Sequence, residues 1–473
     1  MDWERSLTYS KTASAVLLFF AIALAAHAQT FTTLWNFDGT SGADPGTGPL
    51  IQATDGNFWG TTESGGTSTN CTNGCGTIFK ITPRGELTTV YSFEGADGSS
   101  PVGGLVEAVD GDFFYGTTSG GGANGYGTVF KMTPRGVLTT LYSFDFYEDG
   151  AYPEGALVQA ADGDFYGTTM SGGRMDYGPY GLGYGVIFKI TSSGAFTKLY
   201  QFALETSGYP HDPLIQGANG NLYGTTNAGG TGNQGVVFEI TPGGTYTTLH
   251  NFVYYDGEHP DGPVVQAAHG DLYGTTPGPK AGEIFQIKPS GDFAIVYVFC
   301  AQTRYDAAYP AGGLIQATDG NFYGAAGGGG TSRLGAIFEF TTAGTETALH
   351  SFGGPDGSSP QAGLLQATDG VFYGTTSTGG ANGDGTIFRL SVGLGPFVKT
   401  LPASGPVGAT VKILGTDLGH ATGVTFNGTA AAFTVVSPSL MTTTVPAGAT
   451  SGTVQVVLPS GTLSSNIPFR IRP

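Results

Sequence analysis

Hydrophobic and polar residues alternate in short runs along most of this chain, and turns rich in glycine separate the runs. In the first unit of the pattern, the runs cover residues 48–54, 57–62, 76–82 and 87–93. Short alternating runs rich in β-branched and aromatic side chains are typical of β-strands. Residues 29–394 contain no stretch with the 3.6-residue apolar period of a helix. The pattern therefore predicts an all-β protein.

A tetrad of an apolar residue, an aromatic residue, Gly and usually Thr recurs along the chain. Its aromatic residue is Trp59, Tyr115, Tyr166, Tyr223, Tyr273, Tyr323 and Tyr373 in successive copies. Each copy carries four strand-like runs, and an Asp-Gly type turn such as residues 55–56 joins the first two. A single unit could not bury both faces of its sheet, so neighbouring units must cover one another. Seven such units predict a seven-bladed β-propeller with four-stranded blades over residues 29–394.

The two ends of the repeat region are complementary. Residues 31–37 form a lone run of the fourth type, and the seventh unit stops after its third run at residues 385–391. We therefore expect the N-terminal strand to close the last blade and remove its exposed edge. A solenoid or an open array would not need complementary ends.

The N-terminal segment predicts export. Arg5 and Lys11 precede an apolar run at residues 13–26, and residues 26–28 (AHA) fit a cleavage site. The apolar run is shorter than the roughly 20 residues that span a bilayer. We therefore expect residues 1–28 to be a signal peptide, with no transmembrane segment. The mature protein is then secreted, either extracellular or at the cell surface.

The charge of the repeat region argues against a nucleic-acid partner. Residues 29–394 contain 33 Asp and Glu against 12 Lys and Arg, a net charge of −21. Such a surface repels phosphate backbones. The glycine clusters at residues 120–127 and 229–235 lie between strands rather than before a helix, so they do not predict a nucleotide site. We expect no cofactor.

Other motifs favour structural roles. Cys71 and Cys75 share one loop, where a disulfide is plausible after export and no further zinc ligands lie nearby. The Asp-Gly-Asp triplets at residues 110–112 and 162–164 read as turns, because the same positions hold Asn at 219–221, so we expect no metal site. His250 and His350 occupy a strand position that holds Tyr in other copies, which predicts packing. No grouping of side chains dictates a catalytic centre.

The loops after the second and fourth strands carry most of the length variation and share one face. Their aromatic and acidic residues suit recognition of a sugar or a peptide. The candidate ligand-binding residues are Tyr147, Tyr177, Tyr180, Tyr184, Tyr209, Asp212, Tyr255, Asp256 and Tyr305. The alternative is that these tyrosines only cover loop backbone.

Residues 395–473 lose the tetrad and become richer in Val, Thr, Pro and Ser. Their alternating runs predict a small β-sandwich. The segment resembles the IPT/TIG family of immunoglobulin-like domains. The matching pieces are residues 402–408, 413–418, 424–428, 445–448 and 459–461. The resemblance implies a spacer or interaction module without catalytic residues.

The repeats resemble the GloVer tandem repeats of bacterial choice-of-anchor proteins. The residues that carry the resemblance are 127–131 (GTVFK), 162–169 (DGDFYGTT) and Gly172-Gly173. The resemblance implies an exported bacterial surface or extracellular protein without an established activity. No sorting signal is recognised before Pro473.

These observations leave three functional hypotheses. We favour a monomeric, non-catalytic extracellular binding or scaffold protein whose loop face contacts a glycan or a protein. The second is a polysaccharide-acting hydrolase or lyase that uses acids such as Asp149, Asp212 or Asp256, since glycosidases need two carboxyl groups across a cleft. The third is a purely structural surface repeat.

Overall fold

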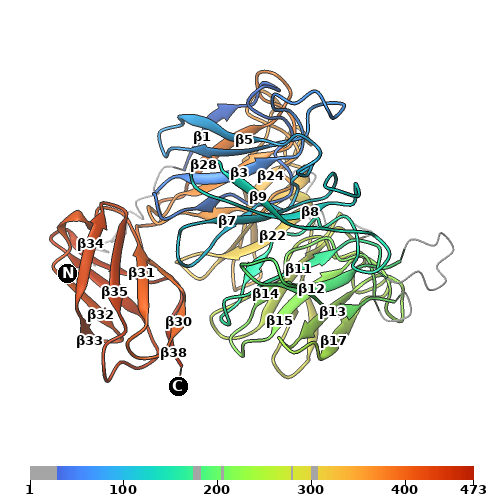
Figure 1. Ribbon diagram of the computed structural model, residues 1–473. Helices are drawn as coiled ribbons and strands as arrows, with labels where there is room; N and C mark the ends of the chain where they lie inside the picture. The colour runs from blue at the N-terminus through green and yellow to red at the C-terminus, as the bar shows by residue number, and fades with distance from the viewer. Residues whose placement is uncertain (1–28, 174–182, 204–206, 279–280, 300–306, 473) are drawn as a thin grey trace, which may run out of the picture.

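The computed structural model describes residues 29–173, 183–203, 207–278, 281–299 and 307–472 (Figure 1). Within these residues the only helix is the 3-10 turn η1 (Leu418–His420). The strands form repeated four-stranded antiparallel sheets, which confirms the predicted all-β class. The predicted signal peptide, residues 1–28, lies outside the described residues.

Seven four-stranded sheets lie between residues 30 and 391 of the described chain. The first sheet contains β2 (Ile51–Gln52), β3 (Phe58–Thr62), β4 (Thr77–Ile81) and β5 (Leu87–Ser92). The second contains β6 (Leu105–Glu107), β7 (Phe114–Thr118), β8 (Thr128–Met132) and β9 (Leu138–Ser143). The third contains β10 (Val158–Gln159), β11 (Phe165–Thr169), β12 (Val186–Ile190) and β13 (Phe196–Gln201). The fourth contains β14 (Ile215–Gln216), β15 (Leu222–Thr226), β16 (Val236–Ile240) and β17 (Tyr246–Asn251).

The remaining three sheets follow the same strand order. The fifth contains β18 (Val265–Gln266), β19 (Leu272–Thr276), β20 (Glu283–Ile287) and β21 (Phe293–Val298). The sixth contains β22 (Ala307–Gln316), β23 (Phe322–Gly329), β24 (Ala336–Phe340) and β25 (Glu346–Ser351). The seventh contains β26 (Leu365–Gln366), β27 (Phe372–Thr376), β28 (Thr386–Ser391) and β1 (Thr30–Asn36).

The first strand of the first sheet is shorter than the alternation of residues 48–54 predicts. Only Ile51 and Gln52 pair with β3. Gly48 lies ahead of them and donates its N–H to the carbonyl oxygen of Val102, in the segment that leads into the second sheet, at 2.9 Å. The residues before β2 therefore join neighbouring units instead of extending a sheet.

The second strands lie at the centre of the packing between sheets. All five residues of β3 are buried, because successive side chains point to opposite faces and a neighbouring sheet covers each face. Trp59 stacks on Phe114 of the second sheet, with ring centroids 4.2 Å apart. Phe58 packs on Tyr373 of the seventh sheet at 4.0 Å. The seventh sheet therefore contacts the first.

The N-terminal strand completes the seventh sheet. β1 pairs antiparallel with β28, from Thr30 opposite Ser391 to Asn36 opposite Thr386. Directly after β1, Phe37 donates its N–H to the carbonyl oxygen of Gly385 at 3.1 Å. The prediction that the two ends of the repeat region pair with each other is confirmed.

A circle of hydrogen bonds joins all seven sheets. The last residue of each first strand accepts the backbone N–H of a residue in the first turn of the preceding sheet, at 2.7–3.1 Å. The accepting side chains are Gln52, Glu107, Gln159, Gln216, Gln266, Gln316 and Gln366. Gln52 of the first sheet accepts from Thr368 of the seventh, so the circle is complete. Only Glu107 departs from glutamine.

The exception at Glu107 leads to a prediction for stability. Glu107→Gln should leave the free energy of unfolding almost unchanged, because glutamine makes the same bond in the other sheets. Glu107→Leu removes the acceptor of the Thr54 N–H and that of the Thr54 hydroxyl, and should lower the free energy of unfolding by about 1–3 kcal/mol. Denaturant unfolding of both variants measures the difference. An equal cost for both would show that the charge of Glu107, and not its hydrogen bonds, stabilises this position.

The C-terminal unit consists of two four-stranded sheets around one core. One sheet contains β29 (Lys399–Leu401), β31 (Thr410–Leu414), β34 (Phe433–Ser437) and β35 (Leu440–Thr444). The other contains β32 (Gly423–Phe426), β33 (Thr429–Ala431), β36 (Val454–Leu458) and β37 (Gly461–Ser464). β30 (Ser404–Gly405) and β38 (Arg470–Ile471) form a short parallel pair. Ile413 and Met441 of one sheet share the buried core with Val424 and Phe426 of the other. This arrangement is the two-layer sandwich that the alternation predicts.

The sandwich contacts the first turns of the second and seventh sheets (Figure 1). Lys412 donates a hydrogen bond to the carbonyl oxygen of Asp110. Thr416 and Thr368 lie 3.4 Å apart through their hydroxyl oxygens, and Phe397 donates its N–H to Thr368 at 3.0 Å. Burial raises the pKa of the Glu107 carboxyl group. The hydrogen bonds from Thr54 and the positive charge of Lys412 act in the opposite direction but do not outweigh burial.

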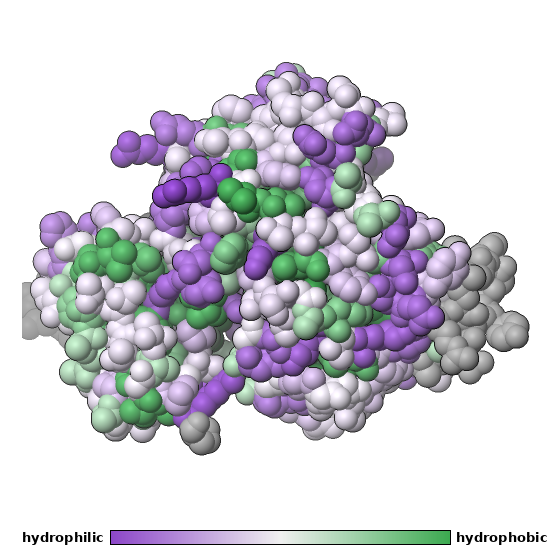
Figure 2. All heavy atoms as spheres, viewed as in Figure 1, coloured by the Kyte–Doolittle hydropathy of each residue, from purple (hydrophilic) through white to green (hydrophobic). Residues whose placement is uncertain are grey.

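The exposed surface does not carry a broad apolar face in the view of Figure 2. Hydrophobic residues form small separate groups among polar ones, both on the repeats and on the sandwich. Within the part of the chain that the structure describes, no helix has the length and apolar character needed to cross a membrane.

Candidate functional site

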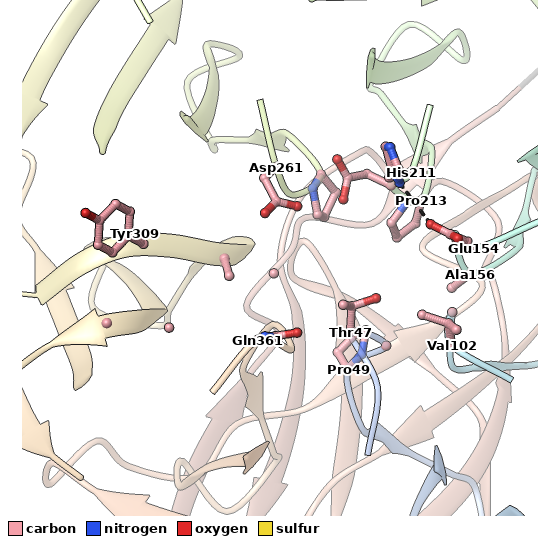
Figure 3. A pocket seen from close by; sticks show the side chains of 18 residues that line it. Thr47, Pro49, Val102, Glu154, Ala156, His211, Pro213, Asp261, Tyr309 and Gln361 are labelled. Atoms are coloured by element: carbon pink, nitrogen blue, oxygen red, sulfur yellow. Dashed lines mark hydrogen bonds and ion pairs between the residues drawn. The ribbon is translucent and has the colours of Figure 1, made fainter. Parts of the chain in front are cut away.

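A cavity of about 400 Å³ lies where the chain segments that enter the seven first strands converge (Figure 3). Each of the seven sheets contributes to its wall. The lining side chains include Thr47, Pro49, Val102, Glu154, His211, Asp212, Asp261, Tyr309 and Gln361. The cavity lies at the opposite end of the first strands from the turns that contact the sandwich.

A strained backbone position recurs in each segment that lines the cavity. It is the residue before a proline, and its φ lies between 52° and 59° in all seven copies. The seven residues are Asp44, Ser100, Tyr152, Tyr209, His259, Tyr309 and Ser359. Left-handed backbone is rare for such residues, and it persists only where surrounding bonds fix it.

Hydrogen bonds to the neighbouring sheet hold this backbone in place. Tyr209 donates its N–H to Tyr184 of the third sheet at 3.1 Å and accepts the N–H of Asn227 in its own sheet, also at 3.1 Å. Ser100 makes the equivalent bonds to Cys75 and Ser119. The segments that line the cavity are therefore fixed between two sheets.

The residue after the proline differs from sheet to sheet. From the second sheet to the seventh it is Val102, Glu154, His211, Asp261, Ala311 and Gln361. The three ionisable members come from three consecutive sheets, the third to the fifth, and all line the cavity. The ionisable groups of the site are therefore concentrated on one side.

The next position is small in the other sheets because the segments approach closely. A Cβ on Gly155 would lie 2.8 Å from the backbone of Asp212, and one on Gly312 would lie 2.3 Å from the nitrogen of Gly363. Asp212 is the exception at this position. Its Oδ2 accepts the hydroxyl of Thr225 at 3.0 Å, and its carboxylate also accepts the N–H of Gly262.

The environment of Asp212 favours its protonated form. Burial raises the pKa of Asp212 to about 7, and the negative charge of Asp261 adds to this effect. The Gly262 N–H, His211 and Thr225 act in the opposite direction but do not outweigh burial. Burial also raises the pKa of Asp261, although solvent reaches this side chain in the cavity.

His211 is the basic member of the cluster. Its Nδ1 lies 2.9 Å from Oε2 of Glu154. Burial alone would lower the pKa of His211, but the hydrogen bond and charge of Glu154, together with the charges of Asp212 and Asp261, raise it. The His211–Glu154 pair therefore joins the third and fourth sheets across the cavity wall (Figure 3).

The negative potential extends to the first sheet. Burial raises the pKa of Glu63, and the charges of Asp44 and Glu154 raise it further. Burial likewise raises the pKa of Asp44. The charge of Glu154 therefore reaches Glu63 of the first sheet, although neither Glu63 nor Asp44 lines the cavity.

Among the predicted site residues that the structure describes, Asp212 alone lies in the cavity wall. Tyr209 and Tyr184 pack edge to face at 5.5 Å, and Tyr184 is buried, so these two cover loop backbone. Tyr147 and Tyr255 are 56% and 89% exposed and lie outside the cavity lining. The predicted site residues Tyr177, Tyr180 and Tyr305 lie outside the described residues.

The acids Asp149 and Asp256 occupy a different, structural position. Asp256 accepts the N–H of Val253 at 2.7 Å and pairs with Nε2 of His250 at 3.1 Å. Asp149 accepts the N–H of Asp145 at 2.9 Å and the hydroxyl of Tyr142. Neither acid lines the cavity, so only Asp212 of the three proposed acids lies beside another cavity carboxyl.

Two structural predictions are confirmed in the loops and outer strands. Cys71 and Cys75 form a disulfide in the loop between β3 and β4. His250 stacks on Phe293 and His350 on Phe31, each with ring centroids 3.6 Å apart. Among the described residues, no three His, Cys, Asp or Glu side chains are grouped closely enough to hold a metal ion.

The sequence analysis did not single out Glu154, His211 or Asp261. The signal that would have found them is the Xaa-Pro pair whose proline lies six residues before the Glu or Gln at the end of each first strand, from the second sheet onward. Aligning the repeats on this pair places the three ionisable residues at one position. That position lines the cavity in every sheet from the second to the seventh.

Comparison with protein families identifies the repeats. The model of the Gloeobacter/Verrucomicrobia repeat matches residues 8–182, 176–318 and 281–436. The chain belongs to the Gloeobacter/Verrucomicrobia repeat family. This finding confirms the family of the repeats. The resemblance to choice-of-anchor proteins and that of residues 395–473 to IPT/TIG domains stay predictions.

The chain also shows a general likeness in fold to several solved structures. A gluconolactonase from Xanthomonas campestris is 13% identical, with 78% of this chain and 92% of that chain covered and a TM-score of 0.41. A candidate 6-phosphogluconolactonase from Bacteroides uniformis is 17% identical, with 64% and 83% covered and a TM-score of 0.43. A luciferin-regenerating enzyme is 13% identical, with 62% and 92% covered and a TM-score of 0.40. No curated protein sequence matches the chain.

Proposed function

We propose that the seven sheets are the blades of a seven-bladed β-propeller and that residues 395–473 form an immunoglobulin-like domain of the IPT/TIG type. The circle of hydrogen bonds from Gln52 to Gln366 supports the closed arrangement, as does the contact between Phe58 and Tyr373. Full closure would leave each sheet covered on both faces. The cavity would then lie on the propeller axis.

In this proposal the protein is an exported, non-catalytic binding protein, and the cavity binds a carbohydrate. The observation that carries the proposal is the convergence of Glu154, His211 and Asp261 on one wall of a cavity that also contains an exposed aromatic ring, Tyr309. Ligand sites are concave and combine a few convergent polar groups with apolar walls. The disulfide between Cys71 and Cys75 agrees with folding in an oxidising compartment.

Binding of oligosaccharides to mature protein, residues 29–473, tests this proposal. In a calorimetric or glycan-array screen we expect at least one saccharide to bind. Glu154→Gln and Asp261→Asn should each weaken its binding about tenfold, since a charged hydrogen bond contributes about 1.5–3 kcal/mol.

Two controls locate the site. Glu86→Gln changes an exposed acid in a turn at the opposite end of the first sheet and should leave affinity unchanged. Tyr255→Ala changes an exposed loop tyrosine outside the cavity and should also have no effect. Loss of binding with Tyr255→Ala but not with Asp261→Asn would place the site on the outer loops and contradict the axial cavity.

A hydrolase or lyase acting on polysaccharides is the second candidate. The observation that favours it is Asp212, whose pKa is raised to about 7 beside a second carboxyl, Asp261. Such a pair has the protonation states of a general acid and a base in glycoside cleavage. Products should then appear in the same screen, and their rate of formation should fall as pH rises through 7, because Asp212 loses its proton. Asp212→Asn would stop cleavage while binding remained, whereas binding without products supports the non-catalytic function.

A further inference from the structure

The cavity has an unbalanced charge. Its lining contains the carboxyl groups of Glu154, Asp212 and Asp261, and His211 is its one basic side chain. His211 pairs with Glu154, so any positive charge on His211 is balanced first by that carboxylate. Neither Asp212 nor Asp261 forms an ion pair with any described residue. A ligand would therefore meet the Asp261 carboxyl group without an ion-pair partner, beside the Asp212 carboxyl group, whose environment favours the protonated form.

An aromatic ring lies on the other side of the same cavity. Tyr309 is 56% exposed and stands away from His211 and Glu154 (Figure 3). Its ring lies over Gly328, where a Cβ would come within 2.8 Å of it, so the strand β23 supports the ring from below. An exposed aromatic face opposite carboxylates is the arrangement that recognises ammonium groups.

Building on the carbohydrate-binding role proposed above, we propose that the cavity selects a saccharide with free, protonated amino groups over its neutral counterpart. The ammonium group would lie between Asp261 and the ring of Tyr309, and the carbonyl oxygen of the Asp212 carboxyl group would accept one of its hydrogen bonds. The sugar hydroxyls would use the side chains of Thr47 and Gln361, which also line the cavity.

The geometry favours an ammonium group over a metal ion. A metal requires several ligand atoms within about 2–2.6 Å, and the described acids and histidines are too dispersed to provide three of them. An ammonium group needs no such close shell, because its charge is satisfied by separate hydrogen bonds and by an aromatic face. The prolines Pro49, Pro213 and Pro263 provide apolar surface for a sugar ring.

The test compares two tetrasaccharides that differ only in their amino groups. Calorimetry at pH 6 and low salt would use the β-1,4-linked glucosamine tetramer and its fully N-acetylated form with the mature protein. We expect the free amine to bind at least tenfold more tightly, and we expect added salt to reduce this preference because it screens charge. Asp261→Asn and Tyr309→Ala should each remove most of the preference. Tyr309→Phe, which keeps the aromatic face, and Glu86→Gln should retain it.

The outcomes separate this inference from the proposed function. Equal affinity for both tetramers, with binding sensitive to Glu154→Gln, would overturn the amine preference and leave the carbohydrate site standing. No binding of any saccharide by protein whose circular dichroism shows folded β-structure would overturn the proposed function itself. Tighter binding of a tetralysine peptide than of the glucosamine tetramer would show that the cavity recognises cationic peptides, and would overturn the saccharide assignment.

Discussion

Gly185→Ala is expected to lower the free energy of unfolding by about 2–5 kcal/mol. Gly185 has a φ of +88°, and a Cβ at this position would lie 2.1 Å from the carbonyl oxygen of Thr169. A left-handed alanine costs about 1–2 kcal/mol, and forcing an atom into a packed site costs a further 1–3 kcal/mol. The clash involves backbone, so a change of rotamer cannot relieve it. Equilibrium unfolding in guanidinium chloride, followed by fluorescence of the buried Trp59, measures the effect.

Gly163→Ala is the matched control in the same sheet. Gly163 has a φ of +90°, but a Cβ there would meet no atom within 4 Å. Its replacement should therefore cost only the conformational part, about 1–2 kcal/mol. An equal loss of stability in the two variants would show that steric contact at the entry to β12 contributes nothing to the cost of Gly185→Ala. That result would contradict the close approach of the chain at this position.

A glycine in the position of Gly185, directly before the third strand, recurs in other sheets. Gly76, Gly127 and Gly235 all have φ between +91° and +96°, with a Cβ position 2.2–2.5 Å from a carbonyl oxygen of the second strand. The same glycine also faces the proline of the following sheet, since a Cβ on Gly127 would lie 2.7 Å from Pro153. The glycine therefore determines how closely successive sheets approach, and substitution of any member of the set should have a comparable effect.

Phe37→Ala should destabilise the protein by about 3–5 kcal/mol, the usual cost of removing a buried phenylalanine side chain. Phe37 is completely buried and packs edge to face on Phe79 at 5.3 Å. It belongs to the core between the seventh and first sheets, which includes Leu50 and Tyr373. The substitution thus weakens the junction at which the two ends of the repeat region meet. Denaturant unfolding measures the change.

Val137→Ala provides the comparison for Phe37→Ala. Val137 directly precedes the outer strand β9 and is 65% exposed, so its truncation should change stability by no more than about 0.5 kcal/mol.

Addition of a peptide with the sequence of residues 29–38 to a chain that begins after this segment should restore part of the lost stability. A loss below about 1 kcal/mol with Phe37→Ala would mean that the junction contributes little, against the expected cost of a buried ring.

Much of the fold could be predicted because it depends on local patterns that repeat. In the tetrad around Trp59, successive side chains point to opposite faces of the strand, and apolar side chains lie on both faces. Burying both faces requires a neighbouring sheet on each side. The Asp55-Gly56 turn carries its own bond, from the Asn57 N–H to the Asp55 carboxylate, and so acts independently of distant packing. The complementary ends predicted the pairing of β1 with β28. The disulfide of Cys71 and Cys75 followed from their spacing in one loop.

The candidate site could be predicted only in part. Aromatic and acidic residues on loops indicated a binding face, but their composition did not distinguish Tyr184, which is buried, from Tyr255, which is exposed. Asp212 and Asp256 are both loop acids in the sequence, yet one lines the cavity and the other pairs with His250. The partner of a loop side chain depends on contacts with another sheet, and such contacts leave no local signal.

The sequence by itself therefore determined the strands, their number in each repeat, the turns and the closing pair, because period, turn chemistry and spacing act over a few residues. Only the tertiary structure decided which position of each repeat lines the cavity. That choice depends on how seven first strands converge and on the close contact of residues such as Gly155 with the following sheet. The convergence places Glu154, His211 and Asp261 together, although successive members lie 57 and 50 residues apart in the sequence. The pKa of Asp212 is likewise a property of this assembly, since burial and Asp261 raise it only after the fourth and fifth sheets have packed side by side.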